Sequence, residues 1–213
     1  MTHSIIAGAT GLVGNSILSQ LAARGDRPIA LARRQIDDLP ANAKMLEIDF
    51  KQFLLNGELP YCHHLYLCLG TTIKTAGSRE AFRIVDFEYS FAVAKKAIEV
   101  GATGLSLVSS VGANANSKSF YLRTKGQLEE AIKSLGFLSV NIYRPGLLIG
   151  HRQEKRMGEQ TGQILSKFVD PLLFGRLSQY RSINANLLAG TMIDYAARGE
   201  GVNYFYSRDF NIE

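Results

Sequence analysis

This 213-residue chain has few cysteines, no long apolar run and no repeated or low-complexity segment. Its two cysteines, Cys62 and Cys68, lack the paired spacing of a metal site, so we expect no metal centre and reduced thiols in a cytoplasmic protein. No apolar run approaches the roughly 18–20 residues that a membrane span needs. The first residues lack the basic segment and cleavage site of a secretory signal, because the first apolar run is itself a predicted strand.

The charge balance does not indicate nucleic-acid binding, although the net charge is +5 and the isoelectric point is near 9.2. Basic residues are scattered along the chain, and the densest clusters are Arg33-Arg34 and residues 152–156. Such clusters suit a phosphorylated small molecule better than a duplex, so we expect no nucleic-acid partner.

A glycine-rich stretch near the start predicts a strand, a tight turn and a helix over residues 4–18. Backbone N–H groups at such a helix start, with the helix dipole behind them, favour a pyrophosphate. A strand–helix connection that is merely rich in glycine is the alternative. The candidate phosphate-binding residues are Gly8, Thr10, Gly11, Leu12, Val13 and Gly14.

The second predicted strand, residues 28–32, ends at Arg33 and Arg34. In a dinucleotide-binding fold this strand end lies beside the adenosine ribose, where an acidic residue would select NAD(H). Two arginines suit a 2′-phosphate instead, so NADP(H) is favoured over NAD(H). Solvated surface charges are the alternative.

Strand-like and helix-like segments alternate along the rest of the chain, which is typical of a doubly wound parallel sheet. We therefore predict an α/β Rossmann fold that is one NAD(P)-binding domain over residues 1–213, with residues 151–202 forming a small C-terminal cap on the substrate side. The further strands are expected at 44–50, 65–69, 105–108, 137–143 and 203–206. Helices are expected at 12–24, 82–100, 120–135, 163–168 and 185–198.

Two strand ends add candidate cofactor residues. Asp49 ends the third predicted strand and could accept from the adenine amino group or cap the next turn. Small residues after the fourth strand let a cofactor backbone pass close by. These small residues are Gly70, Thr71 and Thr72, and the strand residue before them, Leu69, is a candidate as well. His63 and His64, at the start of that strand, are expected to be structural.

Tyr121 and Lys125 are four residues apart in a predicted helix, so both side chains lie on one helical face. A nearby ammonium favours the phenolate form, which makes Tyr121 a usable proton donor or acceptor near neutrality. A serine at the preceding strand end, Ser109 or Ser110, could hold the substrate oxygen. Ser110 is preferred, and Ser109 stays open.

With these residues in view, the chain resembles the short-chain dehydrogenase/reductase superfamily, in its extended and atypical branch. The resemblance rests on residues 10–14, Ser109-Ser110, the Tyr121–Lys125 pair and Arg144-Pro145-Gly146. Residues 109–113 and 152–159 are similar to atypical (NmrA-like) members grouped with the Tat-interacting, tumour-suppressor-like proteins.

The resemblance implies bound NADP(H), with Pro145 and Leu147 beside the nicotinamide and Arg144 as an internal hydrogen-bond hub. Many relatives carry an asparagine that supports the lysine's proton relay, whereas this chain has Asp86 there, which could hold a water equally well. After Gly150 there are 213 − 150 = 63 residues, so a bulky nucleotide-sugar substrate is not expected.

The resulting hypothesis is an NADP(H)-dependent oxidoreductase acting on a small carbonyl or hydroxyl substrate, in which Tyr121 moves the proton and Lys125 binds the cofactor ribose and tunes the phenol. Arg152 is a candidate contact to an anionic substrate, and a solvated loop held by internal salt bridges is the alternative. The alternative is a dinucleotide-binding sensor or assembly factor that turns nothing over and binds a protein partner. A homodimer stays open. Tyr121 and Lys125 favour catalysis, because a sensor needs no tuned phenol.

Overall fold

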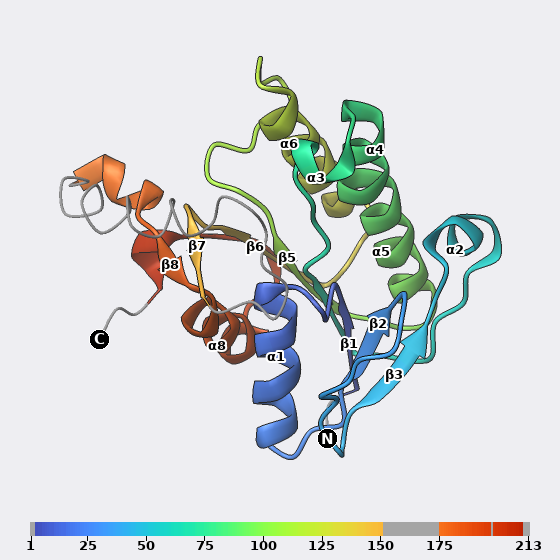
Figure 1. The fold of residues 1–213 in the computed structure, drawn as a ribbon. Coiled ribbons are helices and arrows are strands. Elements are labelled where there is room, and N and C mark those ends of the chain that lie inside the picture. Colours follow the sequence, from blue (N-terminus) through green and yellow to red (C-terminus); the bar gives the residue numbers. More distant parts are fainter. Residues whose placement is uncertain (1–2, 151–174, 197, 211–213) are drawn as a thin grey trace.

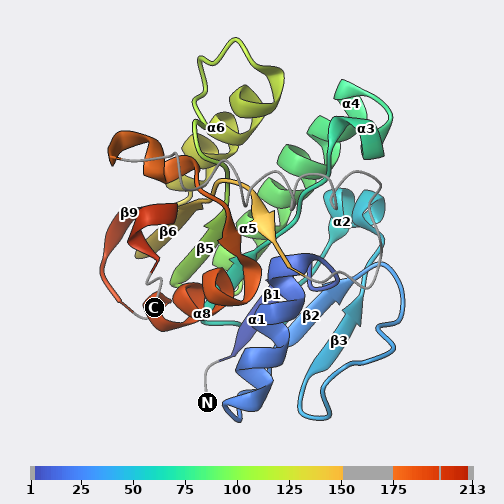
Figure 2. The same cartoon turned by 60° about the vertical axis from the view of Figure 1, so that its left-hand side comes forward.

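The computed structural model describes residues 3–150, 175–196 and 198–210, and they form a seven-stranded sheet with helices on both faces (Figures 1 and 2). Its order is β3-β2-β1-β4-β5-β6-β9, and every neighbouring pair is parallel. The strands are β1 (Ser4–Ala7), β2 (Ile29–Ala32), β3 (Lys44–Glu47), β4 (His64–Leu67), β5 (Gly104–Val108), β6 (Ser139–Arg144) and β9 (Gly201–Tyr206). This arrangement confirms the predicted doubly wound α/β fold.

Helices cover the two faces of the sheet separately (Figure 1). On one face, α1 (Leu12–Ala23) and α8 (Ala185–Tyr195) bury a core that includes Ile6 and Tyr143. On the other face lie α2 (Phe50–Asn56), α5 (Ser90–Glu99) and α6 (Phe120–Lys133). The remaining elements are α3 (Ile73–Ala76), α4 (Arg79–Arg83), the π-helix η1 (Ile84–Tyr89), the 3₁₀ helices η3 (Gly175–Tyr180) and η4 (Ser207–Asp209), and a separate parallel pair of β7 (Leu148–Ile149) with β8 (Ile183–Asn184).

The central strands are covered on both faces, which explains their apolar sequences. Leu65 and Leu67 of β4 belong to the core under α5 and α6, whereas Tyr66 belongs to the core under α1 and α8. His64 is buried at the amino end of β4, and its Nε2 lies 2.9 Å from Ser106 Oγ. Burial lowers the pKa of His64 to about 3, so this histidine is neutral and structural, as expected.

α8 packs against α1 through polar contacts as well as apolar ones. Ser16 Oγ donates to Asn186 Oδ1 at 2.8 Å, and Arg24 forms an exposed ion pair with Asp194 at 2.8 Å. α8 falls within the residues predicted to form a cap, 151–202. In the structure it packs beside α1, in the helical layer on that face of the sheet.

Several predicted boundaries were wrong. The helix predicted at 82–100 begins earlier, at Arg79, and contains the π-helical turn η1. The third strand ends at Glu47 rather than residue 50, because Asp49 starts α2, a helix that was not predicted. α8 ends at Tyr195, short of residue 198. The predicted helix at 163–168 lies outside the described residues.

No helix in the described ranges is both long and apolar enough to cross a membrane. The same ranges hold no cluster of His, Cys, Asp and Glu side chains suited to a metal ion. Cys62 is buried and Cys68 half-buried, and both are free thiols. Burial raises the pKa of Cys62 to about 11 and that of Cys68 to about 12, although the positive charge of Lys125 opposes the shift at Cys68.

The sheet order reverses between β1 and β4, which lie side by side although other strands and helices separate them in sequence. In open α/β sheets, ligands bind outside the carboxyl ends of the strands at such a reversal. The candidate residues after β1, β4, β5 and β6 all follow carboxyl ends and thus share this edge.

We expect Gly14→Ala to lower the free energy of unfolding by about 1–3 kcal/mol, the usual cost of overpacking. A Cβ at Gly14 would lie 2.2 Å from the Gly8 carbonyl oxygen, which belongs to rigid backbone. The matched control is Gly190→Ala in α8, where the nearest atom is the flexible Gln20 Oε1 at 3.3 Å. Urea unfolding of both variants checks this, and equal stability would contradict it.

Candidate functional site

The turn between β1 and α1 is built so closely that only glycine fits at two positions. Gly8 has φ +88°, and a Cβ there would lie 2.6 Å from the Cys68 backbone. Gly14 packs on the Gly8 carbonyl, and Gly11 N donates to Gly8 O at 2.9 Å. No side chain caps the start of α1, whose N-cap is Gly11. The first N–H groups of α1 therefore remain available to an anion, which fits a pyrophosphate.

The other predicted residues of this turn differ in exposure. Thr10 is exposed, whereas Val13 is 4% exposed and belongs to the core, so Val13 can offer only its backbone. Leu12 lies under the chain that follows β7, since a Cβ at Gly150 would be 2.8 Å from Leu12 Cδ1.

One face of α6 presents Tyr121, Lys125 and Glu129 at successive four-residue spacings. The Tyr121 ring is half-buried against Phe82, with ring centroids 5.7 Å apart. The loop after β5 lies against the same helix, because Asn114 N donates to Leu122 O at 3.2 Å. This contact brings the loop that begins at Ser109 and Ser110 to the first turns of α6.

Lys125 is buried and forms an ion pair with Asp86, with Nζ 2.7 Å from Oδ1. Burial lowers the pKa of Lys125, but the charges of Asp86 and Tyr121 raise it, and the net shift is upward. Lys125 therefore remains an ammonium at physiological pH. From the sequence, Asp86 could hold a water in the lysine's proton relay, whereas in the structure its carboxylate contacts Lys125 directly.

Glu129 is a functional candidate that the sequence analysis missed. It is 1% exposed, accepts from Ser109 Oγ, and binds Arg144 through both carboxylate oxygens. Arg144 also donates to the Tyr206 hydroxyl at 3.0 Å, which makes it the expected hydrogen-bond hub. The acidic residue four positions after Lys125, on the same face, was the available signal.

The two candidate serines have different environments. The Ser109 hydroxyl is buried and held by Glu129. Ser110 is half-buried, and its hydroxyl makes only a long contact of 3.4 Å to the Val111 carbonyl oxygen among the described residues. Ser110 is thus the serine whose hydroxyl remains available to a ligand.

At the position where the sequence predicts the adenosine ribose, Arg33 and Arg34 are both exposed after β2. Asp49 caps α2 by accepting from Lys51 N at 2.7 Å and from Gln52 N at 3.4 Å, so one of its two expected roles is present. Burial raises the pKa of Tyr89. The negative charge of Asp49 raises this pKa further and the positive charge of Arg33 lowers it, so both charges act on the Tyr89 phenol.

The segment after β4 connects the glycine turn to Lys125. Leu69 packs against the core, Gly70 is exposed, and Thr71 N donates to Asp86 Oδ2 at 2.8 Å. Thr72 caps α3 by accepting from Thr75 N at 3.0 Å. This segment thus approaches Lys125 through Gly70 and Thr71, whereas the Leu69 and Thr72 side chains have structural contacts.

The turn after β6 is partly structural. Pro145 is buried and its carbonyl accepts from Val111 N at 3.0 Å, whereas Leu147 is 47% exposed. Arg152 lies outside the described residues.

Comparison with known proteins identifies the family, although no protein-family model matches the chain. The curated protein named Protein FMP52, mitochondrial, from Candida albicans is 34% identical over 206 residues, which covers 92% of this chain and 88% of that protein. This chain belongs to the FMP52 family. Other fungal members that are 32–34% identical carry the same name.

The FMP52 relatives contradict the expected cytoplasmic location, because their names place them in mitochondria. That expectation rested on the low cysteine number. Reduced thiols indicate only that a protein resides in a reducing compartment. They cannot distinguish the cytosol from other reducing compartments.

Solved structures share the fold of this FMP52 family member at low sequence identity. The enzyme WbmH of Bordetella bronchiseptica, determined in complex with NAD⁺, gives a TM-score of 0.70 at 17% identity, over 97% of this chain and 76% of WbmH. The human epimerase family protein SDR39U1, determined with NADPH, gives 0.65 at 16% identity, over 96% of this chain and 74% of that one. These likenesses establish the fold.

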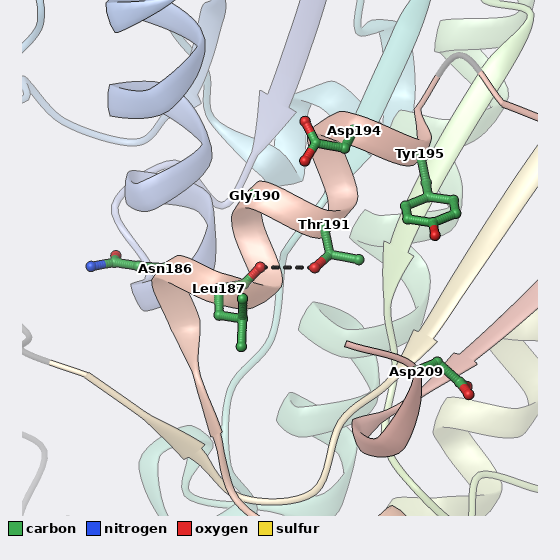
Figure 3. A pocket seen from close by; sticks show the side chains of 7 residues that line it. All are labelled: Asn186, Leu187, Gly190, Thr191, Asp194, Tyr195 and Asp209. Atoms are coloured by element: carbon green, nitrogen blue, oxygen red, sulfur yellow. Dashed lines mark hydrogen bonds between the residues drawn. The ribbon is translucent and has the colours of Figure 1, made fainter. Parts of the chain in front are cut away.

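A separate depression of about 200 Å³ lies along α8 (Figure 3). It shares no residue with the candidate site of this FMP52 family member. Two of its polar side chains already have partners: Thr191 Oγ1 donates to Leu187 O at 3.0 Å, and Asp194 pairs with Arg24. The lining residues are Asn186, Leu187, Gly190, Thr191, Asp194, Tyr195 and Asp209.

We expect Glu129→Gln to lower the free energy of unfolding by about 1–3 kcal/mol, because it leaves the half-buried Arg144 guanidinium against a neutral amide. The control is Glu130→Gln, whose exposed pair with Lys133 at 2.7 Å should be worth less than about 1 kcal/mol. Urea unfolding compares the two. Similar losses would show that Glu129 does not hold the strand ends together.

Proposed function

We propose that this FMP52 family member is an NADP(H)-dependent oxidoreductase that acts on a small carbonyl or hydroxyl substrate. The observation that carries the proposal is the placement of a glycine turn with an uncapped helix start and a Tyr121–Lys125 face at one sheet edge. The backbone after β4 joins them, since Gly8 packs on Cys68 and Gly70 lies over Lys125.

The glycine turn supports a dinucleotide in particular. A side chain at Gly8 or Gly14 would clash with backbone, and the start of α1 offers uncapped N–H groups. WbmH and SDR39U1, which share the fold, were determined with NAD⁺ and NADPH respectively. Arg33 and Arg34 follow β2 where a 2′-phosphate would lie, which favours NADP(H).

In this proposal a bound dinucleotide supplies or accepts the hydride. Tyr121 donates a proton to the substrate oxygen in reduction, or accepts it in oxidation. Lys125 remains positively charged beside the phenol, because Asp86 offsets its burial. Ser110 donates its hydroxyl to the same substrate oxygen, while Ser109 anchors the strand end to Glu129.

The finer assignments of the site belong to this proposal. We assign dinucleotide contacts to the backbone of residues 8–14, to Gly70 and Thr71, and to Pro145 and Leu147. The Lys125 ammonium is proposed to bind the cofactor ribose. We further infer that the chain stands near the atypical members grouped with the Tat-interacting proteins, and that residues 151–202 contribute a substrate-side cap. Asp49 is proposed to face adenine with the carboxylate oxygen that does not cap α2.

We expect calorimetry to show tight NADPH binding and weak NADH binding. Arg33→Ala and Arg34→Ala should each weaken NADPH binding about 10-fold, as loss of a charge-assisted contact does, and leave NADH unchanged. The control is Arg27→Ala, at the opposite end of β2. Equal affinities for both dinucleotides would show that the arginines do not bind a 2′-phosphate. No binding of either would overturn the proposal.

We expect Tyr121→Phe to lower turnover at least about 100-fold, because a general acid contributes this much, and to leave NADPH affinity nearly unchanged. NADPH oxidation against a panel of small carbonyl compounds measures turnover. Tyr61→Phe is the control, since Tyr61 is 52% exposed and precedes the amino end of β4. A folded, NADPH-binding parent that oxidises no substrate would favour the sensor alternative, whose partner binding should survive Tyr121→Phe.

A further inference from the structure

Asp86 lies in a π-helical turn and is fully buried. The turn η1 interrupts a helical run that begins as α4 at Arg79 and continues as α5 to Glu99. A π turn displaces the helical register locally, and such turns are frequent at functional sites. Asp86 is 0% exposed although its neighbour Glu88 is exposed, so the turn directs a carboxylate inward.

The carboxylate of Asp86 joins parts of the molecule that are distant in sequence. Its Oδ1 lies 2.7 Å from Lys125 Nζ on α6, and its Oδ2 accepts from Thr71 N at 2.8 Å in the segment after β4. A Cβ at Gly70 would lie 3.5 Å from Oδ1 and 3.7 Å from Nζ, in ordinary contact with both. The ion pair therefore lies directly beneath the exposed backbone of Gly70.

The ammonium retains donors beyond this contact. Lys125 has three N–H groups, and Asp86 is its ion-pair partner among the described residues. The other charged or titratable groups near Lys125 are Tyr121 and Glu129 on α6 and Cys68 after β4. Glu129 is engaged by Arg144 and Ser109, so Asp86 supplies the counter-charge.

We propose that Asp86 is a positioning residue that keeps Lys125 charged beneath Gly70, where the ammonium would meet a dinucleotide passing over this segment. The inference rests on the proposed function and deepens it. Asp86 acts through Lys125, so removing its charge should affect dinucleotide binding only where Lys125 can lose its proton.

The experiment measures NADPH affinity from pH 6 to pH 9 by calorimetry for the parent and for Asp86→Asn. In the parent, the net upward pKa shift keeps Lys125 charged throughout, so affinity should show no loss attributable to Lys125. In Asp86→Asn, burial acts without this counter-charge and lowers the pKa of Lys125. The loss relative to the parent should be under about 3-fold at pH 6 and should grow by up to about 10-fold for each pH unit above the lowered pKa of Lys125.

The amide of Asp86→Asn can still accept from Thr71 N, so this variant isolates the charge. Glu88→Gln, an exposed carboxylate in the same turn, is the matched control and should follow the parent at every pH. A constant loss across the pH range would indicate a merely structural role for Asp86 and would overturn the inference.

A second set of variants covers the case in which Asp86→Asn does not fold. Lys125→Met with Asp86→Asn removes both buried charges, which proteins tolerate better than one unpaired charge. This double variant should bind NADPH as weakly as Lys125→Met alone, because Asp86 acts only through Lys125. A further loss in the double variant would contradict the inference. If the folded parent binds no dinucleotide, the proposed function is wrong, and this inference is wrong as well.

Discussion

The ion pair between Glu129 and Arg144 constrains the rest of the candidate site. A buried carboxylate is costly unless it is fully paired, and Glu129 is paired by Arg144 and the Ser109 hydroxyl. These contacts join α6 to the carboxyl ends of β5 and β6, and Arg144 extends them to Tyr206 at the end of β9. Because Tyr121 and Lys125 share the helical face of Glu129, their positions relative to the strand ends follow from this ion pair.

Much of the fold was predictable because its signals are local. Apolar runs marked the buried strands, and glycines marked the exits from strands and helices. The predicted order of the seven strands in the main sheet therefore agrees with the structure, as does the presence of α1, α5, α6 and α8, whereas α2, α3, β7 and β8 were not predicted. The spacing of Tyr121 and Lys125 was sufficient to place both on one face of α6. Gly8 and Gly14 were recognisable because a turn this close tolerates no side chain.

The rest depended on contacts between distant residues. Ser109 and Glu129 are 20 positions apart, and nothing in the local sequence of either indicates the other. The π turn that buries Asp86 has no clear local pattern, so the direct contact with Lys125 could not be distinguished from a water-mediated one. Asp49 illustrates a different limit, because one residue type serves equally as a helix cap and as a ligand.

The environments of the two thiols, one buried and one half-buried, limit how they can react with oxidants. Thiolate is the form that peroxides and alkylating agents attack, and raised pKa values leave almost none of it at Cys62 and Cys68 near neutral pH. The sequence contains no other cysteine. Sulfenylation and thiol exchange at these two cysteines are therefore unfavourable reactions near neutral pH.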